Sequence, residues 1–320
     1  MKGILASAAL CGAVSASLYG ESNLNHSCVL QDPIWSCSAN AQPDLVDTCC
    51  SETFGGMFLA TQFWSTYTGL ESEGQLLPAN SWTLHGLWPD FCNGSYTQYC
   101  DFDRQYDPAP SPNTTTGDAS GTPVPPYKGP SIDTFLHPFG KFDLLSWMSK
   151  YWINQNAPSK NLWAHEFSKH ATCYSTFDTP CYGPKAAPHS DVVEFFETAV
   201  AYFRRHPTYD WLAEAGITPS NKTSYTLDEL QWPLTKASGA VPYLGCTGPR
   251  FNETKAGKGS LDGGYTVLDE VYYYFHAKGR PQDMNVRPVD ADAVGSDTTC
   301  AHSKGAIWYY ERAKGSEAEV

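Results

Sequence analysis

Ten cysteines between Cys28 and Cys300 constrain the fold of this chain more than any other feature. The eleventh, Cys11, lies in the N-terminal segment, so the number that remains is even, as a fully oxidised framework requires. A zinc site would need cysteine pairs about two to four residues apart, and pairs such as Cys92 and Cys100 are too widely spaced. We therefore predict five disulfides among Cys28, Cys37, Cys49, Cys50, Cys92, Cys100, Cys173, Cys181, Cys246 and Cys300.

The N-terminus has the pattern of a secretory signal. Lys2 is followed by a short apolar run of small residues, with a small-residue exit near residues 14–16. We expect residues 1–17 to be this signal, which is too short to span a bilayer. No later stretch approaches the ~18 apolar residues of a membrane helix. The expected location is extracellular, with a vacuolar or other endomembrane lumen as the alternative. Five Asn-x-Ser/Thr sequons fit the same route and are expected on surface loops: Asn25, Asn93, Asn113, Asn221 and Asn252.

The net charge of −13 should repel a polyanion at neutral pH. This argues against a nucleic-acid binder that works at neutral pH. It does not exclude an enzyme that works in acid, because histidines with a pKa near ~6.5 gain charge and some carboxylates lose it as the pH falls.

The residue pattern predicts an α+β fold, in which helices pack against an antiparallel sheet and disulfides staple the chain. Strand-like segments are residues 56–64, 81–87, 265–275 and 306–310. Helical spacing is found at residues 142–148, 161–173 and 191–205. In the second strand the alternation places Thr83, His85 and Leu87 on one face. Asp191 and Glu194 have the spacing of a capping box.

Length and composition favour one domain over two. We expect a single catalytic domain over residues 18–314, followed by a charged tail at 315–320. Residues 107–130 are rich in Pro, Ser, Thr and Gly and are expected to form a surface insertion with no core of its own.

Two short segments contain the residues for acid/base chemistry. The first is Trp82-Thr83-Leu84-His85-Gly86-Leu87-Trp88-Pro89-Asp90, and the second runs from His165 to Cys173. If the second is a helix at about 100° per residue, its titratable side chains lie within an arc of about 140°; they are His165, Glu166, Lys169 and His170. Histidines as acid and base, with cations beside them, suit chemistry on a phosphodiester, and the flanking aromatic residues suit a nucleobase.

Other interpretations of these residues were weighed. Zinc hydrolysis is disfavoured because the spacing His-Glu-x-x-x-His is one residue longer than the zincin motif, so the two imidazoles diverge. The helix could be a solvated charged face, and His85 alone could be a core histidine. Four titratable groups within six positions, matched by a histidine in an apolar strand, favour a catalytic function over both.

The two segments resemble the active-site segments of the ribonuclease T2 family of secreted acid ribonucleases, and most of all its fungal members. The resemblance extends to the cysteine layout and covers residues 25–312. This chain has Phe167 and Ala171 where the family usually has Trp and Gly. These changes leave each catalytic position filled, so they put efficiency in question more than identity.

The resemblance implies cleavage of single-stranded RNA by transphosphorylation through a 2′,3′-cyclic phosphate, without a metal or other cofactor and with low base specificity. It makes His170 the base and His85 the acid, although the set of residues is more secure than this order. Glu166 and Lys169 would stabilise the pentacoordinate state, and His165 would hold the phosphate. We expect a monomer whose partner is RNA and not a membrane.

The resemblance also implies the base-binding residues. Trp88, Asp90 and Tyr96 match the first base pocket, in which Asp90 could accept a hydrogen bond from an exocyclic amine, and Gln62 resembles a residue near the second pocket. Trp88 could instead be a core or turn tryptophan. The Asn93 sequon lies between Asp90 and Tyr96, where a glycan could crowd the pocket.

The disulfide pairing comes from the resemblance as well, because ten cysteines allow about 945 pairings. The implied pairs are Cys28–Cys49, Cys37–Cys92, Cys50–Cys181, Cys100–Cys173 and Cys246–Cys300.

Two other functions remain as alternatives. A glycoprotein of this fold could bind RNA or a partner without cutting, but it would be expected to have lost one of the catalytic residues. A glycosidase could use Asp90 and Glu166 as paired carboxylates, but the three histidines would then have no explanation.

Overall fold

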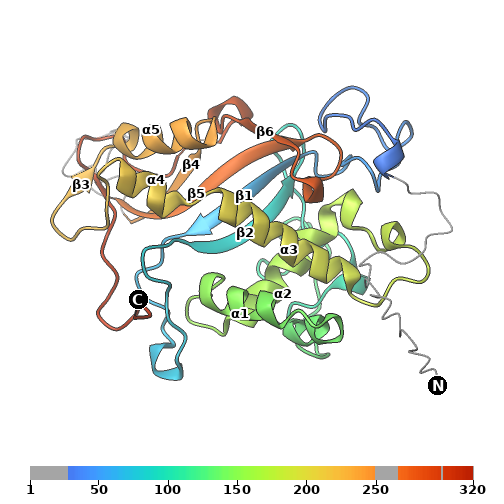
Figure 1. Ribbon diagram of the computed structural model, residues 1–320, viewed down its shortest axis with the longest axis horizontal. Helices are drawn as coiled ribbons and strands as arrows, with labels where there is room; N and C mark the ends of the chain where they lie inside the picture. The colour runs from blue at the N-terminus through green and yellow to red at the C-terminus, as the bar shows by residue number, and fades with distance from the viewer. Residues whose placement is uncertain (1–27, 249–265, 297, 320) are drawn as a thin grey trace, which may run out of the picture.

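A seven-stranded sheet lies at the centre of the described part of the molecule (Figure 1). The structure is a computed structural model that describes residues 28–248, 266–296 and 298–319. The strands pair in the order β2-β1-β5-β7-β3, with β4 and β6 also paired to β5. They are β1 (Met57–Phe63), β2 (Thr83–Asp90), β3 (Ser224–Tyr225), β4 (Tyr243–Thr247), β5 (Thr266–Ala277), β6 (Val286–Val289) and β7 (Ile307–Trp308). The predicted α+β class is confirmed. The sheet differs from a purely antiparallel one because β5 and β7 run parallel.

The helices gather around the β1–β2 edge and at the far end of the sheet, as Figure 1 shows. They are α1 (Phe142–Tyr151), α2 (Ser159–Lys169), α3 (Ser190–Arg205), α4 (Thr208–Glu214) and α5 (Leu227–Ser238). Helix α3 packs against β1 and β2, and α2 packs against the edge strand β2. No helix within the described residues is both long enough and apolar enough to cross a membrane.

The two faces of the sheet have different surroundings. On one face, Phe58 and Ala60 of β1 join the main core with the apolar side of α3. On the other face, Leu59 and Tyr274 form a small cluster against which Trp88 packs. The second face is therefore the one that remains available for a site.

A β-bulge decides where His85 lies. The pairing of β1 with β2 shifts between Thr61 and Gln62, which pair with Gly86 and Leu84, so His85 has no partner across the ladder. The predicted alternation is wrong for this reason. One extra residue in a strand reverses the side-chain parity beyond it, and Leu84 and Leu87 both enter the main core.

Two helix ends differ from the sequence prediction. The helix expected at 161–173 is α2, which ends at Lys169 and leaves His170 as its C-cap with φ −111°. The capping box expected at Asp191 is wrong: α3 begins after His189, which has φ +68° and makes no side-chain cap. The Asp191 carboxylate instead accepts from buried Arg104 at 3.4 Å, because pairing that cation outweighs a cap bond.

The disulfides confirm three of the implied pairings, which are Cys37–Cys92, Cys100–Cys173 and Cys246–Cys300. The other two are wrong, because Cys28 bonds Cys50 and Cys49 bonds Cys181. Cys49 and Cys50 are adjacent residues in a turn closed by the bond from Cys50 N to Asp47 O, at 2.9 Å. Adjacent side chains in a turn point in different directions, so the turn conformation selects which sulfur faces Cys181.

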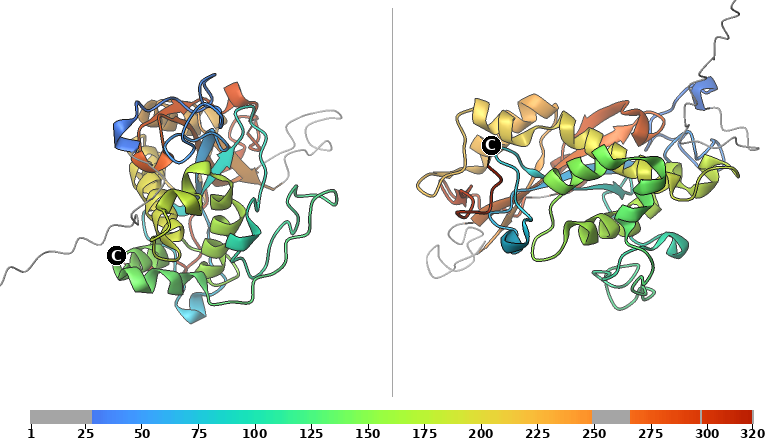
Figure 2. Two further views of the ribbon diagram at one scale, coloured as in Figure 1. Left: turned by 90° about the vertical axis from the view of Figure 1, so that its right-hand side faces the viewer. Right: turned by 60° about the horizontal axis from the view of Figure 1, so that its bottom comes forward.

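The expected surface insertion at residues 107–130 is a long, mostly exposed loop that projects from the molecule (Figure 2). Its two ends are tied down, since Tyr127 N donates to Asp107 O at 2.9 Å. The segment expected to be a charged tail is mostly exposed over its described residues 315–319, but it is bonded to the domain, because Ala318 N donates to Leu77 O at 2.9 Å. The sequon asparagines Asn93, Asn113 and Asn221 are exposed. Asn25, Asn252 and the expected signal lie outside the described residues.

A buried carboxylate joins the N-terminal segment to the region after α2. Glu52 is fully buried, and its Oε1 accepts from Gly55 N and Ser175 N at 2.9 and 3.1 Å. Its Oε2 accepts from the Thr176 hydroxyl at 2.8 Å. A carboxylate with several donors is stable in a buried position, whereas the donors alone are not.

We expect Glu52→Ala to lower the free energy of unfolding by about 3 kcal/mol, because it leaves several buried donors without an acceptor. Urea denaturation at neutral pH measures this loss, with exposed Glu73→Ala as the control. Equal stability of the two variants would show that the hydrogen bonds of Glu52 do not stabilise the connection between the N-terminal segment and the region after α2.

Candidate active site

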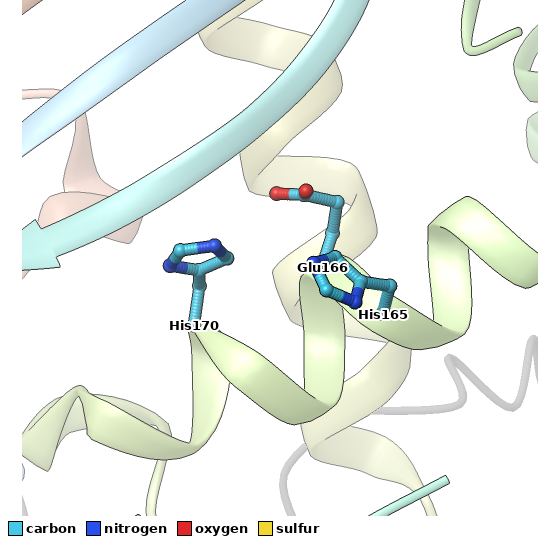
Figure 3. Close-up of side chains that lie close together, drawn as sticks. All are labelled: His165, Glu166 and His170. Carbon is cyan, nitrogen blue, oxygen red and sulfur yellow. The ribbon is translucent and has the colours of Figure 1, made fainter. Parts of the chain in front are cut away.

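Helix α2 and its C-cap bring together three of the predicted site residues, two of them predicted as catalytic and His165 as a phosphate ligand. His165, Glu166 and His170 point from one flank of the helix, with Glu166 and His170 directed toward β2 (Figure 3). One ligand atom of each lies within 4.8 Å of the others. A metal ion could fit that spacing, but Asp107 engages the His165 ring and Trp88 engages Glu166. Within the described residues, Oε1 of Glu166 and Nε2 of His170 keep no hydrogen-bond partner, so these atoms are available for acid/base chemistry.

His165 is held by a carboxylate from the start of the surface insertion. Its Nδ1 lies 2.8 Å from Asp107 Oδ2, and Tyr99 OH donates to the same oxygen at 3.0 Å. Asp107 is buried, while the His165 side chain is 20% exposed. The contact with Asp107 occupies Nδ1 and orients the ring, so Nε2 is the ring nitrogen left to meet an anion.

Glu166 is fully buried and bonded to β2. Trp88 Nε1 donates to Glu166 Oε2 at 2.6 Å, while Oε1 has no hydrogen-bond partner. Burial raises the pKa of Glu166 to about 8, against the opposing effects of Trp88 and Lys169. The group is therefore a neutral carboxylic acid below that pH, able to donate a hydrogen bond as well as accept one.

Gly86 makes this arrangement possible. A Cβ at this position would lie 1.8 Å from Glu166 Oε2 and 2.6 Å from Trp88 Nε1. The lack of a side chain in the strand therefore lets the carboxyl group approach the backbone of β2.

His170 stacks on Trp88, with ring centroids 4.7 Å apart and an angle of 14° between planes. Its Nε2 is buried and has no hydrogen-bond partner. Burial first, and then the charges of Lys169, His165 and His85, lower its pKa well below 6.5. The imidazole is therefore neutral and has an unused ring nitrogen, which are the properties of a general base.

Lys169 lies beside the same cluster. Burial lowers its pKa, while Glu166 and Asp107 act in the opposite direction. Its Nζ donates to Ser111 O of the surface insertion at 3.4 Å.

His85 lies between two carboxyl groups. Its Nε2 is 3.5 Å from Glu166 Oε1, and its Nδ1 is 3.4 Å from Glu270 Oε1 on β5. The ring stacks on Phe63 at 3.6 Å between centroids, and Trp152 Nε1 fixes its backbone by donating to His85 O at 2.7 Å. Burial lowers the pKa of His85 below 6.5, and Glu270 partly offsets this effect.

The comparisons with known proteins agree on one family. The model of the ribonuclease T2 family matches residues 55–282. Ribonuclease Le2 of Lentinula edodes is 35% identical over 275 residues, covering 85% of this chain and 92% of that protein. A ribonuclease T2-like protein of Aspergillus fumigatus is 36% identical over 263 residues, and the chain spans about half (52%) of its length. The crystal structure of Actibind, a T2 ribonuclease, aligns with a TM-score of 0.65 at 29% identity, covering 88% of this chain and 97% of that one.

The chain belongs to the ribonuclease T2 family. Membership gives it endoribonuclease activity. The expectation of this family from the two segments is confirmed.

Three of the four residues that the T2 resemblance assigns to base binding share one cavity. This cavity has a volume of about 510 Å³ and opens beside His170; it is lined by Leu59, Trp88, Asp90, Gly94, Tyr96, Lys169, His170, Tyr243, Tyr272, Tyr274, Gly295 and Ser296. Burial raises the pKa of Asp90 to about 7. A larger cavity of about 580 Å³ lies around Cys100 and Cys173, and none of the five titratable residues of the T2 segments lines it.

The placement of Gln62 near a base pocket is wrong. Gln62 pairs with Leu84 and lies on the core face of the sheet, where it is 1% exposed. Its amide nitrogen donates to His206 O at 2.8 Å and its amide oxygen accepts from the Thr208 hydroxyl at 2.8 Å. Both ends of the side chain are used inside the core, so none is left for a base.

Two further carboxylates that contact the histidines, Asp107 and Glu270, are not among the residues predicted from the sequence. Asp107 was included in the insertion because proline-rich sequence follows it. Glu270 was treated as part of an aromatic strand. A charged residue within such an apolar run was the available signal, because burial of a carboxylate requires a partner.

We expect Gly86→Ala to remove most activity and to destabilise the protein by about 1–3 kcal/mol, because its Cβ would displace the Glu166 carboxyl group. Thermal unfolding and a ribonuclease assay measure the two effects. In the double variant with Glu166→Ala the clash with the carboxyl group is removed, although the one with Trp88 Nε1 remains, so the loss of stability should be less than additive. Strict additivity would rule out the clash.

Proposed function

We propose that this protein is a secreted acid endoribonuclease that cleaves single-stranded RNA by transphosphorylation, through 2′,3′-cyclic phosphate intermediates and with low base specificity. One observation carries the proposal. His85 and His170 both lie near the buried Glu166, but His85 also contacts the Glu270 carboxylate, whereas the charges acting on His170 are those of Lys169, His165 and His85. One histidine is thereby favoured as the acid and the other as the base.

The unequal surroundings support an order for the two proton transfers. His170 Nε2 takes the proton of the ribose 2′-OH, and the 2′-oxygen attacks phosphorus. The bond from phosphorus to the 5′-oxygen breaks, and His85 gives its proton to that oxygen. Hydrolysis of the cyclic phosphate follows by the reverse roles, with water in place of the leaving group.

The remaining α2 residues suit the charge that develops on the phosphoryl oxygens. Lys169 supplies a cation, and protonated Glu166 has Oε1 free to donate. His165, whose Nδ1 is held by Asp107, can offer its Nε2 to the phosphate. Donors held in place before the reaction lower the barrier most, because they need no reorganisation.

The cavity beside His170 fits a nucleobase. Trp88 stands at its inner end and Tyr96, which is 63% exposed, at its outer end. Stacking on aromatic rings tolerates every base, which supports low specificity. Asp90 adds one polar contact, which is a neutral acid below its raised pKa. Asn93 is in an exposed turn, where its Oδ1 accepts from Ser95 N at 3.0 Å, and a glycan directed into solvent there would leave the cavity open.

The compartment and assembly are part of the proposal. The N-terminal pattern, the five disulfides and the sequons support a secretory route that ends outside the cell or in an endomembrane lumen. We propose a monomer, since each residue of the mechanism comes from one chain.

The direct test is incubation of the purified protein with yeast RNA at about pH 4.5 in excess EDTA, followed by product analysis. The expected products are 2′,3′-cyclic nucleotides. His85→Phe and His170→Phe should each lower kcat/KM by about 100- to 10,000-fold, as expected for loss of a general acid or base. Intact RNA, or activity lost on chelation, would overturn the mechanism, and a fully active histidine variant would overturn the roles.

We expect a bell-shaped pH dependence of kcat/KM that lies at pH values below 6.5. His170 must be neutral, so activity rises as pH passes upward through its lowered pKa; His85 must be protonated, so activity falls above its own lowered pKa. Initial rates on a dinucleoside phosphate across pH 3–8 measure both limbs. An optimum at or above neutral pH would contradict the assignment.

A further inference from the structure

Glu270 lies in β5, between β1 and β4, and its side chain lies next to His85 of β2. It pairs with Phe63 of β1 and with Gly245 of β4. Its Oε1 is 3.4 Å from His85 Nδ1, and the Tyr272 hydroxyl donates to its Oε2. The carboxylate is therefore held at one end by Tyr272, and its other oxygen lies at an ion-pair distance from His85 Nδ1, which has no hydrogen-bond partner in the described part of the structure.

The neighbouring strand leaves room for this carboxylate. A Cβ on Gly245 would lie 2.7 Å from the Glu270 Cβ and 3.0 Å from its Oε2. The pairing of β4 with β5 is also irregular between Gly245 and Cys246. A side chain at position 245 would push Glu270 out of its place beside His85.

The remaining contacts of His85 define its orientation. Phe63 covers one face of the ring, and the Trp88 ring meets it edge-on at 4.6 Å and 84°. With Nδ1 toward Glu270, Nε2 is directed toward Glu166 at 3.5 Å. That side of the ring is where the cluster of α2 residues lies.

We propose that Glu270 is a positioning residue, which holds the Nδ1–H of His85 so that Nε2 carries the proton for the leaving 5′-oxygen. This inference rests on the proposed function, in which His85 is the acid. Glu270 itself does not touch the reacting atoms.

The two carboxyl groups beside His85, those of Glu166 and Glu270, differ in charge at acid pH. Glu166, Lys169, His165 and His170 face the ring from α2, and Glu270 faces it from β5. Glu166 is neutral at acid pH because burial raises its pKa to about 8. Burial would also raise the pKa of Glu270, but its contacts with His85 and Tyr272 outweigh this effect and lower it. Phe63, Trp88 and Trp152, which also contact His85, are uncharged.

Glu270 is thus the contacting carboxyl group that carries negative charge in the working pH range. A negative charge beside Nδ1 favours the imidazolium form of His85. It therefore extends the pH range in which this acid is protonated. Asp107 contacts His165 in the same way, at 2.8 Å from its Nδ1. His170, the base, has no carboxylate contact among the described residues.

Replacement of the carboxylate by an amide tests the charge without removing the side chain. In Glu270→Gln we expect the alkaline limb of kcat/KM to move about one unit to lower pH, as expected on removing an adjacent opposite charge. The acid limb, which reports His170, should stay in place. We expect kcat to fall at least about tenfold while KM changes little, because the acid acts in the transition state.

Matched variants separate positioning from structure. Asp269→Asn removes the preceding carboxyl group on β5 and should leave the alkaline limb unchanged. Glu270→Asp keeps the negative charge, so its alkaline limb of kcat/KM should lie between those of the wild type and Glu270→Gln. Tyr272→Phe, which frees Oε2, should give a smaller shift than Glu270→Gln and remains informative if the latter does not fold.

An NMR titration of the His85 ring proton provides a readout that does not depend on activity, with His85→Phe for assignment. The His85 pKa should fall by about one unit in Glu270→Gln. If the wild-type protein does not cleave RNA, the proposed function fails while this titration still tests the contact. If the wild type is active and Glu270→Gln leaves both the limb and the His85 titration unchanged, the positioning inference is overturned.

Discussion

The hydrogen bond from Trp88 Nε1 to Glu166 Oε2 is the interaction on which the site depends. It joins β2 to α2, the elements that carry the two proposed proton-transfer residues. Because Gly86 has no side chain, the carboxyl group lies directly against the strand. The ring of Trp88 also stacks on the ring of His170. One tryptophan thus sets the position of Glu166 and the orientation of the His170 ring.

The surrounding frame limits how far these elements can move. Cys100–Cys173 ties the residue after Tyr99 to the turn that follows α2, and Tyr99 N donates to Lys169 O at 3.0 Å. Cys37–Cys92 anchors the end of β2. A crosslinked frame of this kind suits an enzyme exposed to acid, because covalent links keep their strength where carboxylates are protonated.

The sequence predicted the parts of the fold that depend on local pattern. The apolar spacing of residues 191–205 predicted α3 almost to its ends, since a strongly periodic helix is specified by its own residues. The bulge at His85 could not be predicted, because it arises from the pairing of β2 with β1. The same is true of Gln62, whose polar amide is buried only because His206 and Thr208 lie beneath it.

The sequence by itself determined the family and the proposed set of reactive residues, because two short motifs with recognisable spacing contain His85, His165, Glu166, Lys169 and His170. Only the tertiary structure decided how these residues differ from one another. Asp107 and Glu270 are 58 and 185 positions away from the histidines they contact, and the exchanged partners of Cys49 and Cys50 depend on a turn. Proton affinity is set by burial and by charges a few ångströms away, and these distances exist only in the folded chain.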